Sequence, residues 1–256
     1  MLLRYLKSLI DNSVAELRDI RKNLSAMVYE LITPESHFDG VIFADGDCPT
    51  HPIPLGILRS GRPVIACDNA GAQLIKKWNM LPDAIVGDGD SLPQQFKDRY
   101  KDIIHYVAEQ DYNDLTKATR FFLEHYRSPG TKHPRICYIG CTGKREDHTL
   151  GNISLPTFYR QEFGVEGVLP TDFGWFVYCH GACEFESIPN QQVSIFNLNC
   201  SSLTSQGLQW PIYPFAQWWQ GTVNNALGNA FSIDGNGDYI VYRTYEAKRQ
   251  AHAKED

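Results

Sequence analysis

The sequence of 256 residues lacks the marks of a membrane, secreted or nucleic-acid-binding protein. No apolar run is long enough to span a bilayer. The first ten residues lack an apolar signal region, and no small-residue cleavage site follows them. Acidic side chains also outnumber basic ones. The resulting net charge of −6 argues against general binding to nucleic acids or anionic membranes. We therefore expect a cytoplasmic protein with neither a membrane nor a nucleic-acid partner.

The seven cysteines do not show the spacing of common zinc sites. Cys137 lies close to Cys141, and Cys179 lies close to Cys183, but neither pair has the two-residue gap of such sites. No histidine pattern completes either pair. The expected role of these cysteines is that of small buried hydrophobic side chains.

What the sequence does contain is a regular alternation of strand-like and helix-like segments over residues 36–168. Apolar runs alternate there with stretches of helical periodicity. This alternation predicts an α/β nucleotide-binding domain, in which helices flank a Rossmann-like parallel sheet. The strand-like runs are 41–44, 63–67, 84–86, 103–107 and 135–139, and the helix-like stretches are 69–78, 94–100, 115–126 and 147–161.

The remainder of the chain does not show this alternation of strands and helices. Residues 169–246 hold short strand-like pieces separated by Pro, Gly and Asn turns, which predicts a smaller antiparallel β-sandwich or barrel. Residues 1–35 carry apolar side chains at near-helical spacing and predict a helical extension. Residues 247–256 form a charged tail.

The turn that follows the third strand carries two carboxylates. Asp88 and Asp90 are two residues apart, so in an extended segment their side chains point the same way. Gly87 and Gly89 allow the backbone to approach a ligand closely. Two carboxylates aimed together favour a hard cation, and Mg²⁺ carrying phosphates is the usual case. The alternative is an ordinary acidic turn.

Polar side chains follow the other predicted strands as well. Ligands of parallel sheets bind beyond the carboxyl ends of the strands, so we expect these polar groups to converge at one edge. Besides the turn at residues 87–91, they are Asp45, Asp47, Asp68, Asp111, Asp114 and the segment 140–148.

Segment 140–148 follows a strand and opens a helix. Its glycines let backbone N–H groups approach a phosphate, and the helix N-terminus adds favourable potential. Lys144 and Arg145 add positive charge. The spacing is not that of the ATP-binding P-loop, and a glycine turn with a solvated basic pair is the alternative. Asp114 similarly suits either a helix cap or, with Lys117 on the same face, a metal and phosphate site.

Four motifs resemble, in order and spacing, those of the thiamine pyrophosphokinase family. The resemblance covers roughly residues 40–155 and extends more thinly into the second domain, through Gly207–Trp210 and Thr222–Asn224. Each motif alone is weak, but the four together are specific. They are Cys67–Ala70, Gly87–Ser91, Gln110–Asp114 with Lys117, and Gly143–His148 with Asn152.

The resemblance implies a homodimer that binds thiamine between its subunits. The implied reaction transfers the pyrophosphoryl group of Mg·ATP to the hydroxyethyl group of thiamine and releases AMP. The implied catalytic cluster is Asp68, Asp88, Asp90, Asp111 and Asp114, of which the last four would hold Mg²⁺. The residues implied at ATP are Ser91, Lys117, Gly140, Gly143, Lys144, Arg145, Asp147 and His148. Those implied at thiamine are Trp210, whose aromatic face suits a cationic ring, Thr222 and Asn224.

Three positions depart from the family pattern. Asn69 and Lys144 stand where the family has glycine, and Val223 stands where it has serine. The Val223 position leaves another small alcohol open as the acceptor. The sequence also leaves open whether Asp68 or Asp111 accepts the hydroxyl proton, and whether one or two Mg²⁺ ions bind.

Two other classes of function are alternatives to a pyrophosphokinase. A non-catalytic nucleotide or thiamine sensor is expected to lose the acidic cluster, which is complete here. A sugar-nucleotide transferase would account for the Asp88 and Asp90 pair. It would leave residues 111–114 and 143–148 without a role.

Overall fold

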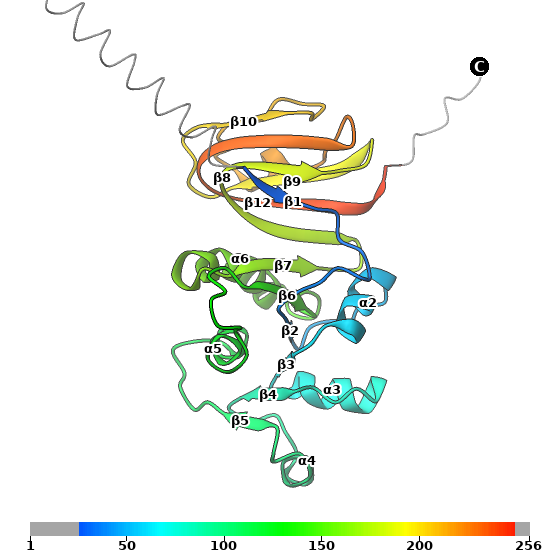
Figure 1. Cartoon of the computed structure of the whole chain (residues 1–256), viewed down its shortest axis with the longest axis vertical. Coiled ribbons are helices and arrows are strands. Elements are labelled where there is room, and N and C mark those ends of the chain that lie inside the picture. The colour runs from blue at the N-terminus through cyan, green and yellow to red at the C-terminus, as the bar shows by residue number, and fades with distance from the viewer. Residues whose placement is uncertain (1–25, 249–256) are drawn as a thin grey trace, which may run out of the picture.

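The computed structural model describes residues 26–248 (Figure 1). The first element in this range is strand β1, Met27–Tyr29, which pairs in parallel with the much later strand β8. The predicted helical extension is therefore wrong over residues 26–35, which contain no helix; a distant strand takes up the backbone hydrogen bonds of residues 27–29. The rest of that prediction up to residue 25, and the charged tail from residue 249, lie outside the described residues.

Within the described residues, six parallel strands form one half of the sheet; five of them correspond to the predicted strand-like runs, and β7 was not predicted. Their order across the sheet is β5-β4-β3-β2-β6-β7, and each neighbouring pair is parallel. The central strands are buried along their whole length, as expected where helices cover both faces. The bounds are β2 Gly40–Phe43, β3 Val64–Cys67, β4 Ala84–Gly87, β5 Ile104–Tyr106, β6 Arg135–Ile139 and β7 Glu166–Pro170.

The helices flank these strands on two sides (Figure 1). One hydrophobic cluster includes side chains of α2 and α3, and the other includes side chains of α5 and α6. Helix α2 begins at Pro52, where a proline is tolerated because it lacks only an N–H that the first turn of a helix does not use. The bounds are α2 Pro52–Ser60, α3 Asn69–Trp78, α4 Gln94–Arg99, α5 Asp114–His125 and α6 Glu146–Phe163.

The other half of the sheet is antiparallel and continues from the first. Strand β8 pairs antiparallel with β7, so both halves belong to one mixed sheet of 12 strands. The predicted antiparallel strands are therefore present, but not as a separate sandwich or barrel. The bounds are β8 Gly174–Glu186, β9 Gln191–Asn197, β10 Leu203–Gln206, β11 Asn224–Asn225 and β12 Ala230–Ala247, with a short 3₁₀ helix at Trp218–Gly221.

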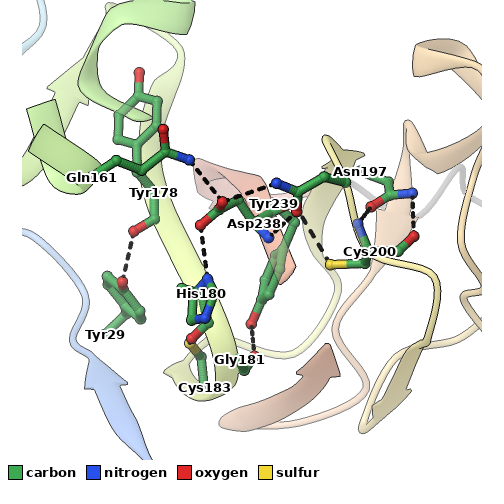
Figure 2. Close-up of polar contacts among 11 residues, drawn as sticks. Tyr29, Gln161, Tyr178, His180, Gly181, Cys183, Asn197, Cys200, Asp238 and Tyr239 are labelled. Carbon is green, nitrogen blue, oxygen red and sulfur yellow. Dashed lines mark hydrogen bonds and ion pairs between the residues drawn. The ribbon is translucent and has the colours of Figure 1, made fainter. Parts of the chain in front are cut away.

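A buried aspartate fastens α6 to the antiparallel half (Figure 2). The carboxylate of Asp238, on β12, lies 2.8 Å from Gln161 Nε2 of α6, 2.9 Å from His180 Nδ1 of β8 and 3.1 Å from Asn199 Nδ2. Burial opposes the ionisation of Asp238, but these hydrogen bonds together outweigh it and lower its pKa. The carboxylate is thus a satisfied structural junction between the two halves.

Two smaller expectations also have outcomes. All seven cysteines are free and six of them are buried, which confirms their expected role as small hydrophobic side chains. Over residues 26–248, no helix combines the length and apolar character needed to cross a membrane.

Candidate active site

A pocket of about 370 Å³ lies at the carboxyl edge of the parallel strands. The segments that follow β2, β3, β4, β5 and β6 each contribute to its wall, as expected for a ligand site in a parallel sheet. The sequence-predicted residues that line it are Asp68, Ser91, Asp114, Gly143, Lys144, Arg145 and His148.

Asp68 is the most unusual residue of the pocket. Its backbone has φ 41° and ψ −118°, a conformation that is costly for a residue with a Cβ atom. Gly87 makes this possible, since a Cβ atom there would lie 2.8 Å from Asp68 Cβ. The residue is 6% exposed, its side chain does not cap α3, and its Oδ1 atom has no hydrogen-bond partner. A buried carboxylate oxygen without a partner calls for a cation or a donor from a ligand.

Asp114 is free to act in the pocket because its neighbour performs the helix cap. Asn113 Oδ1 accepts a hydrogen bond from the backbone N–H of Thr116 at 3.0 Å, so the capping interpretation of Asp114 is wrong. Asp114 Oδ1 instead lies 3.5 Å from Nζ of the buried Lys117. Burial raises the pKa of Asp114, Lys117 opposes that rise, and the nearby Asp68 and Asp88 add to it.

The other predicted metal ligands, Asp88, Asp90 and Asp111, do not line the pocket. Asp88 accepts a hydrogen bond from the backbone N–H of Asp90 at 3.1 Å, and this bond is the main reason that its pKa is lowered. Asp90 and Asp111 are exposed and do not line the pocket. Between residues 26 and 248, no three acidic, histidine or cysteine side chains lie close enough together to hold a metal ion.

Three acidic groups nevertheless carry negative charge that a hard cation would offset. Asp68 Oδ1 has no hydrogen-bond partner, and the charges of Asp68 and Asp88 raise the pKa of Asp114 against the opposing effect of Lys117. Oxygen-only donors of this kind favour Mg²⁺.

The basic side chains of the pocket are paired with carboxylates. Lys144 Nζ lies 3.2 Å from Asp45 Oδ1, and Arg145 contacts both carboxylate oxygens of Asp147, at 3.1 and 2.6 Å. Gly143, at φ 81°, leaves room for Asp47, whose carboxylate would collide with a Cβ atom there. Gly140 and Asp147 belong to the same segment but do not line the pocket.

Several pocket residues were not among the predicted site residues. Asp45 follows β2 directly, so the strand-end rule indicated it without assigning a role. Asn69 Nδ2 lies 3.4 Å from both carboxylate oxygens of Asp45. Asn152 Nδ2 donates to the carbonyl oxygen of Cys141 at 2.9 Å and holds the segment after β6 against α6.

The residues implied at thiamine form a second group, in the antiparallel half. Asn224, 6% exposed, accepts a hydrogen bond from the Trp210 backbone N–H at 3.1 Å and donates one to the Trp210 carbonyl at 2.8 Å. Thr222 donates to the carbonyl of Trp219 at 2.7 Å. Between them, Val223 has φ 58°, an outlier for a β-branched residue. Trp210, Thr222 and Asn224 do not line the pocket around Asp68.

Comparison with known proteins identifies the family. The model of the thiamin pyrophosphokinase catalytic domain matches residues 57–165, and the model of the thiamin pyrophosphokinase substrate-binding domain matches residues 174–242. Together the two matches cover more than half of the chain. The chain belongs to the thiamin pyrophosphokinase family. This is a family of transferases, and the resemblance found in the four motifs is confirmed.

Curated members of the thiamin pyrophosphokinase family match the chain over shorter stretches. Thiamin pyrophosphokinase 1 of Caenorhabditis elegans is 29% identical over 92 residues, which cover 35% of this chain and 37% of that protein. Thiamine pyrophosphokinase 3 of Oryza sativa subsp. japonica is 35% identical over 78 residues, 29% of either chain. The chain thus spans about a third of the length of the curated relatives it matches.

Solved structures of the thiamin pyrophosphokinase family share the fold over most of their length. The enzyme from Candida albicans superposes with a TM-score of 0.71 at 16% identity, covering 87% of this chain and 94% of that one. The Bacillus subtilis enzyme gives a TM-score of 0.63 at 20% identity, covering 80% of this chain and 98% of that one. The mixed sheet is therefore the fold of this family.

Proposed function

We propose that this protein is a thiamine diphosphokinase, which transfers the pyrophosphoryl group of Mg·ATP to thiamine. The hydroxyethyl oxygen of thiamine attacks the β-phosphorus, the bond from that phosphorus to the α,β-bridging oxygen breaks, and AMP leaves. The products are thiamine diphosphate and AMP. The observation that carries this proposal is the buried, unpartnered carboxylate oxygen of Asp68, in a pocket that also holds Asp114, Lys144 and Arg145.

The acidic and basic residues of the pocket have separate tasks in this reaction. Asp88 and Asp114 would hold Mg²⁺, with Asp90 and Asp111 at the rim as further candidate ligands. The metal would neutralise phosphate charge. Lys117, Lys144 and Arg145 supply the remaining positive charge and orient the triphosphate.

Asp68 is favoured over Asp111 as the acceptor of the thiamine hydroxyl proton. Asp68 lines the pocket and has a free carboxylate oxygen, whereas Asp111 is exposed outside it. A general base must reach the proton that it takes, and of these two aspartates only Asp68 lines the pocket.

We also propose that the active protein is a homodimer, with thiamine bound between subunits. Trp210, Thr222 and Asn224 do not line the nucleotide pocket of their own chain, so a second copy is the natural source of the thiamine-binding wall. An apolar groove of about 400 Å³, which a second copy would cover, runs between α6 and the antiparallel strands, past Phe158 and Trp218. Light scattering that gives the mass of one chain in the active protein would contradict this arrangement.

The proposed reaction is tested by separating AMP from ATP by chromatography after incubation with Mg²⁺, with and without thiamine. AMP should form only when thiamine and the metal are both present, and chelation with EDTA should stop it. The Asp90→Asn variant should lose Mg²⁺-dependent AMP formation while its circular dichroism is unchanged. Asp102→Asn, an equal change of charge at an exposed position, serves as the control.

Each outcome of this assay decides one part of the proposal. AMP release that does not depend on thiamine overturns the transferase activity. Near-normal turnover by Asp90→Asn removes Asp90 from the metal site.

A second acceptor is worth testing because Val223 occupies a strained and exposed position beside Asn224. The alternative function is a pyrophosphokinase for another small alcohol. Turnover of thiamine at micromolar concentration would dismiss it. The cytoplasmic location expected from the sequence stays a prediction.

A further inference from the structure

Two basic side chains that line the nucleotide pocket, those of Lys144 and Arg145, are paired with carboxylates. Lys144 Nζ lies 3.2 Å from Asp45 Oδ1 and donates to the Asp45 carbonyl at 2.6 Å. Arg145 is paired with Asp147 through two nitrogens. A polyphosphate that enters the pocket therefore competes with a carboxylate for the full charge of either side chain.

The Lys144–Asp45 pair is the easier one to exchange. An ammonium group is a single point charge, whereas the Arg145 guanidinium holds both oxygens of its partner in a planar fork. Water screens both pairs, since the side chains of Lys144 and Asp45 are 46% and 41% exposed and those of Arg145 and Asp147 are 71% and 64% exposed, so the geometry of the contacts separates them. Lys144 and Asp45 both line the pocket, whereas Asp147 does not.

Asp45 does not depend on Lys144 alone. Gln73 Nε2 donates to Asp45 Oδ1, and Asn69 Nδ2 lies 3.4 Å from both carboxylate oxygens. These two amide donors belong to α3 and would stay in place if Lys144 turned away. The release of Lys144 would thus leave the Asp45 carboxylate hydrogen-bonded.

The backbone at Lys144 points to a specific use of this side chain. Its φ is 56°, a left-handed conformation that glycine adopts freely and that a lysine adopts at a cost. Lys144 and Asn69 both contact Asp45.

We propose that Asp45 sets the affinity for nucleotide by competing with a phosphate group for Lys144. In the free protein Asp45 holds Lys144, and on binding the ammonium group moves to a phosphate oxygen while Asn69 and Gln73 keep Asp45 in place. Asp45 is thus a positioning residue of the nucleotide site. This inference rests on the proposed function.

The test is calorimetric titration of the full-length protein with ATP in magnesium chloride. Asp45→Asn keeps an oxygen acceptor for Gln73 but loses the charge, so it should tighten ATP binding about three- to five-fold. Lys144→Met should weaken binding about ten-fold. In the double variant the tightening should vanish, so that its affinity equals that of Lys144→Met within about two-fold.

Asp47→Asn is the matched control, because it removes the same charge two residues away without touching Lys144. It should stay within about two-fold of the wild type. Inorganic tripolyphosphate in place of ATP should give the same order of affinities among the variants. If Asp45→Asn does not fold, as judged by circular dichroism, Asp45→Ser replaces it.

The outcomes separate this inference from the proposed function. Unchanged or weaker binding by Asp45→Asn, a tightening that persists without Lys144, or equal tightening by Asp47→Asn overturns the competition. If the variants change the affinity for ATP but not the affinity for tripolyphosphate, the proposed contact between Lys144 and a phosphate group is wrong. If the wild type binds no nucleotide, the proposed function itself fails, whereas normal wild-type binding with unresponsive variants removes only the role of Asp45.

Discussion

Asp68 and Asp238 are equally buried, at 6% and 7% exposed, yet their surroundings are opposite. Asp238, in the antiparallel half, has its carboxylate surrounded by donors from Gln161, His180 and Asn199. Asp68, at the edge of the parallel half, has a strained backbone and an oxygen with no partner. Burial alone therefore does not distinguish the two carboxylates. Unmet hydrogen-bonding capacity together with backbone strain does, and on that basis we propose a functional role for Asp68.

The largest effect that separates the two residues is expected from Asp68→Asn. This change should lower thiamine-dependent AMP formation at least about 100-fold, because it removes charge where the substrate or metal needs it. The free energy of unfolding should fall by less than about 0.5 kcal/mol, since Asp68 Oδ1 accepts no hydrogen bond from residues 26–248. Retained activity together with a large loss of stability would make Asp68 structural, like Asp238.

Asp238→Ala should show the reverse pattern. It leaves three donors without their acceptor, so urea denaturation at neutral pH should show a loss of about 1–3 kcal/mol in the free energy of unfolding. AMP formation by the folded variant should change less than about three-fold. Asp234→Ala is the control, because Asp234 lies on the same strand but is exposed.

The stability that Asp238 contributes should also depend on pH. Because its pKa is lowered in the folded state, the contribution is present above the ordinary aspartate value of 3.8 and is lost as the pH falls through the folded value. The difference between wild type and Asp238→Ala should therefore shrink below pH 3.8. If the difference in the free energy of unfolding stays unchanged in acid, the ionised form of Asp238 is not the source of its stabilising effect.

The smallest effect is the contrast in titration between the two regions. The pKa of Asp114 in the pocket is raised, first by burial, so its carboxyl group should titrate above 3.8. Asp238 should titrate below that value. The measurement is an NMR pH titration of the carboxyl carbons, and Asp114 titrating below Asp238 would reverse the comparison.

The parallel half was predictable from the sequence because its signals are local. Helix α3 spans residues 69–78 as its periodicity predicted, and polar residues that follow successive strands meet in one pocket. The continuity between β7 and β8 was not predictable in the same way, and neither was strand β1. Met27 pairs with Cys183, and no pattern around residue 27 specifies a partner so distant in the sequence.

The candidate site was predictable in part for the same reason. Strand ends and glycine turns indicated where Asp68, Asp114 and Lys144 belong. They did not indicate side-chain direction, so Asp90 and Asp111 were expected in a cluster and are exposed outside the pocket. The bond from Gln73 to Asp45 had no signal in the sequence, because it depends on how α3 lies against the segment after β2.

The hydrogen-bonded ladder from β7 to β8 has a consequence for how substrates are enclosed. Many two-part kinases close on their substrates by swinging one lobe about a linker. Here strand β8 continues the sheet directly, and α6 is hydrogen-bonded to β12 through Asp238, so rotation of one half against the other would break these hydrogen bonds. We therefore expect water to be excluded by side chains at the rim or by a neighbouring molecule rather than by closure of the two halves.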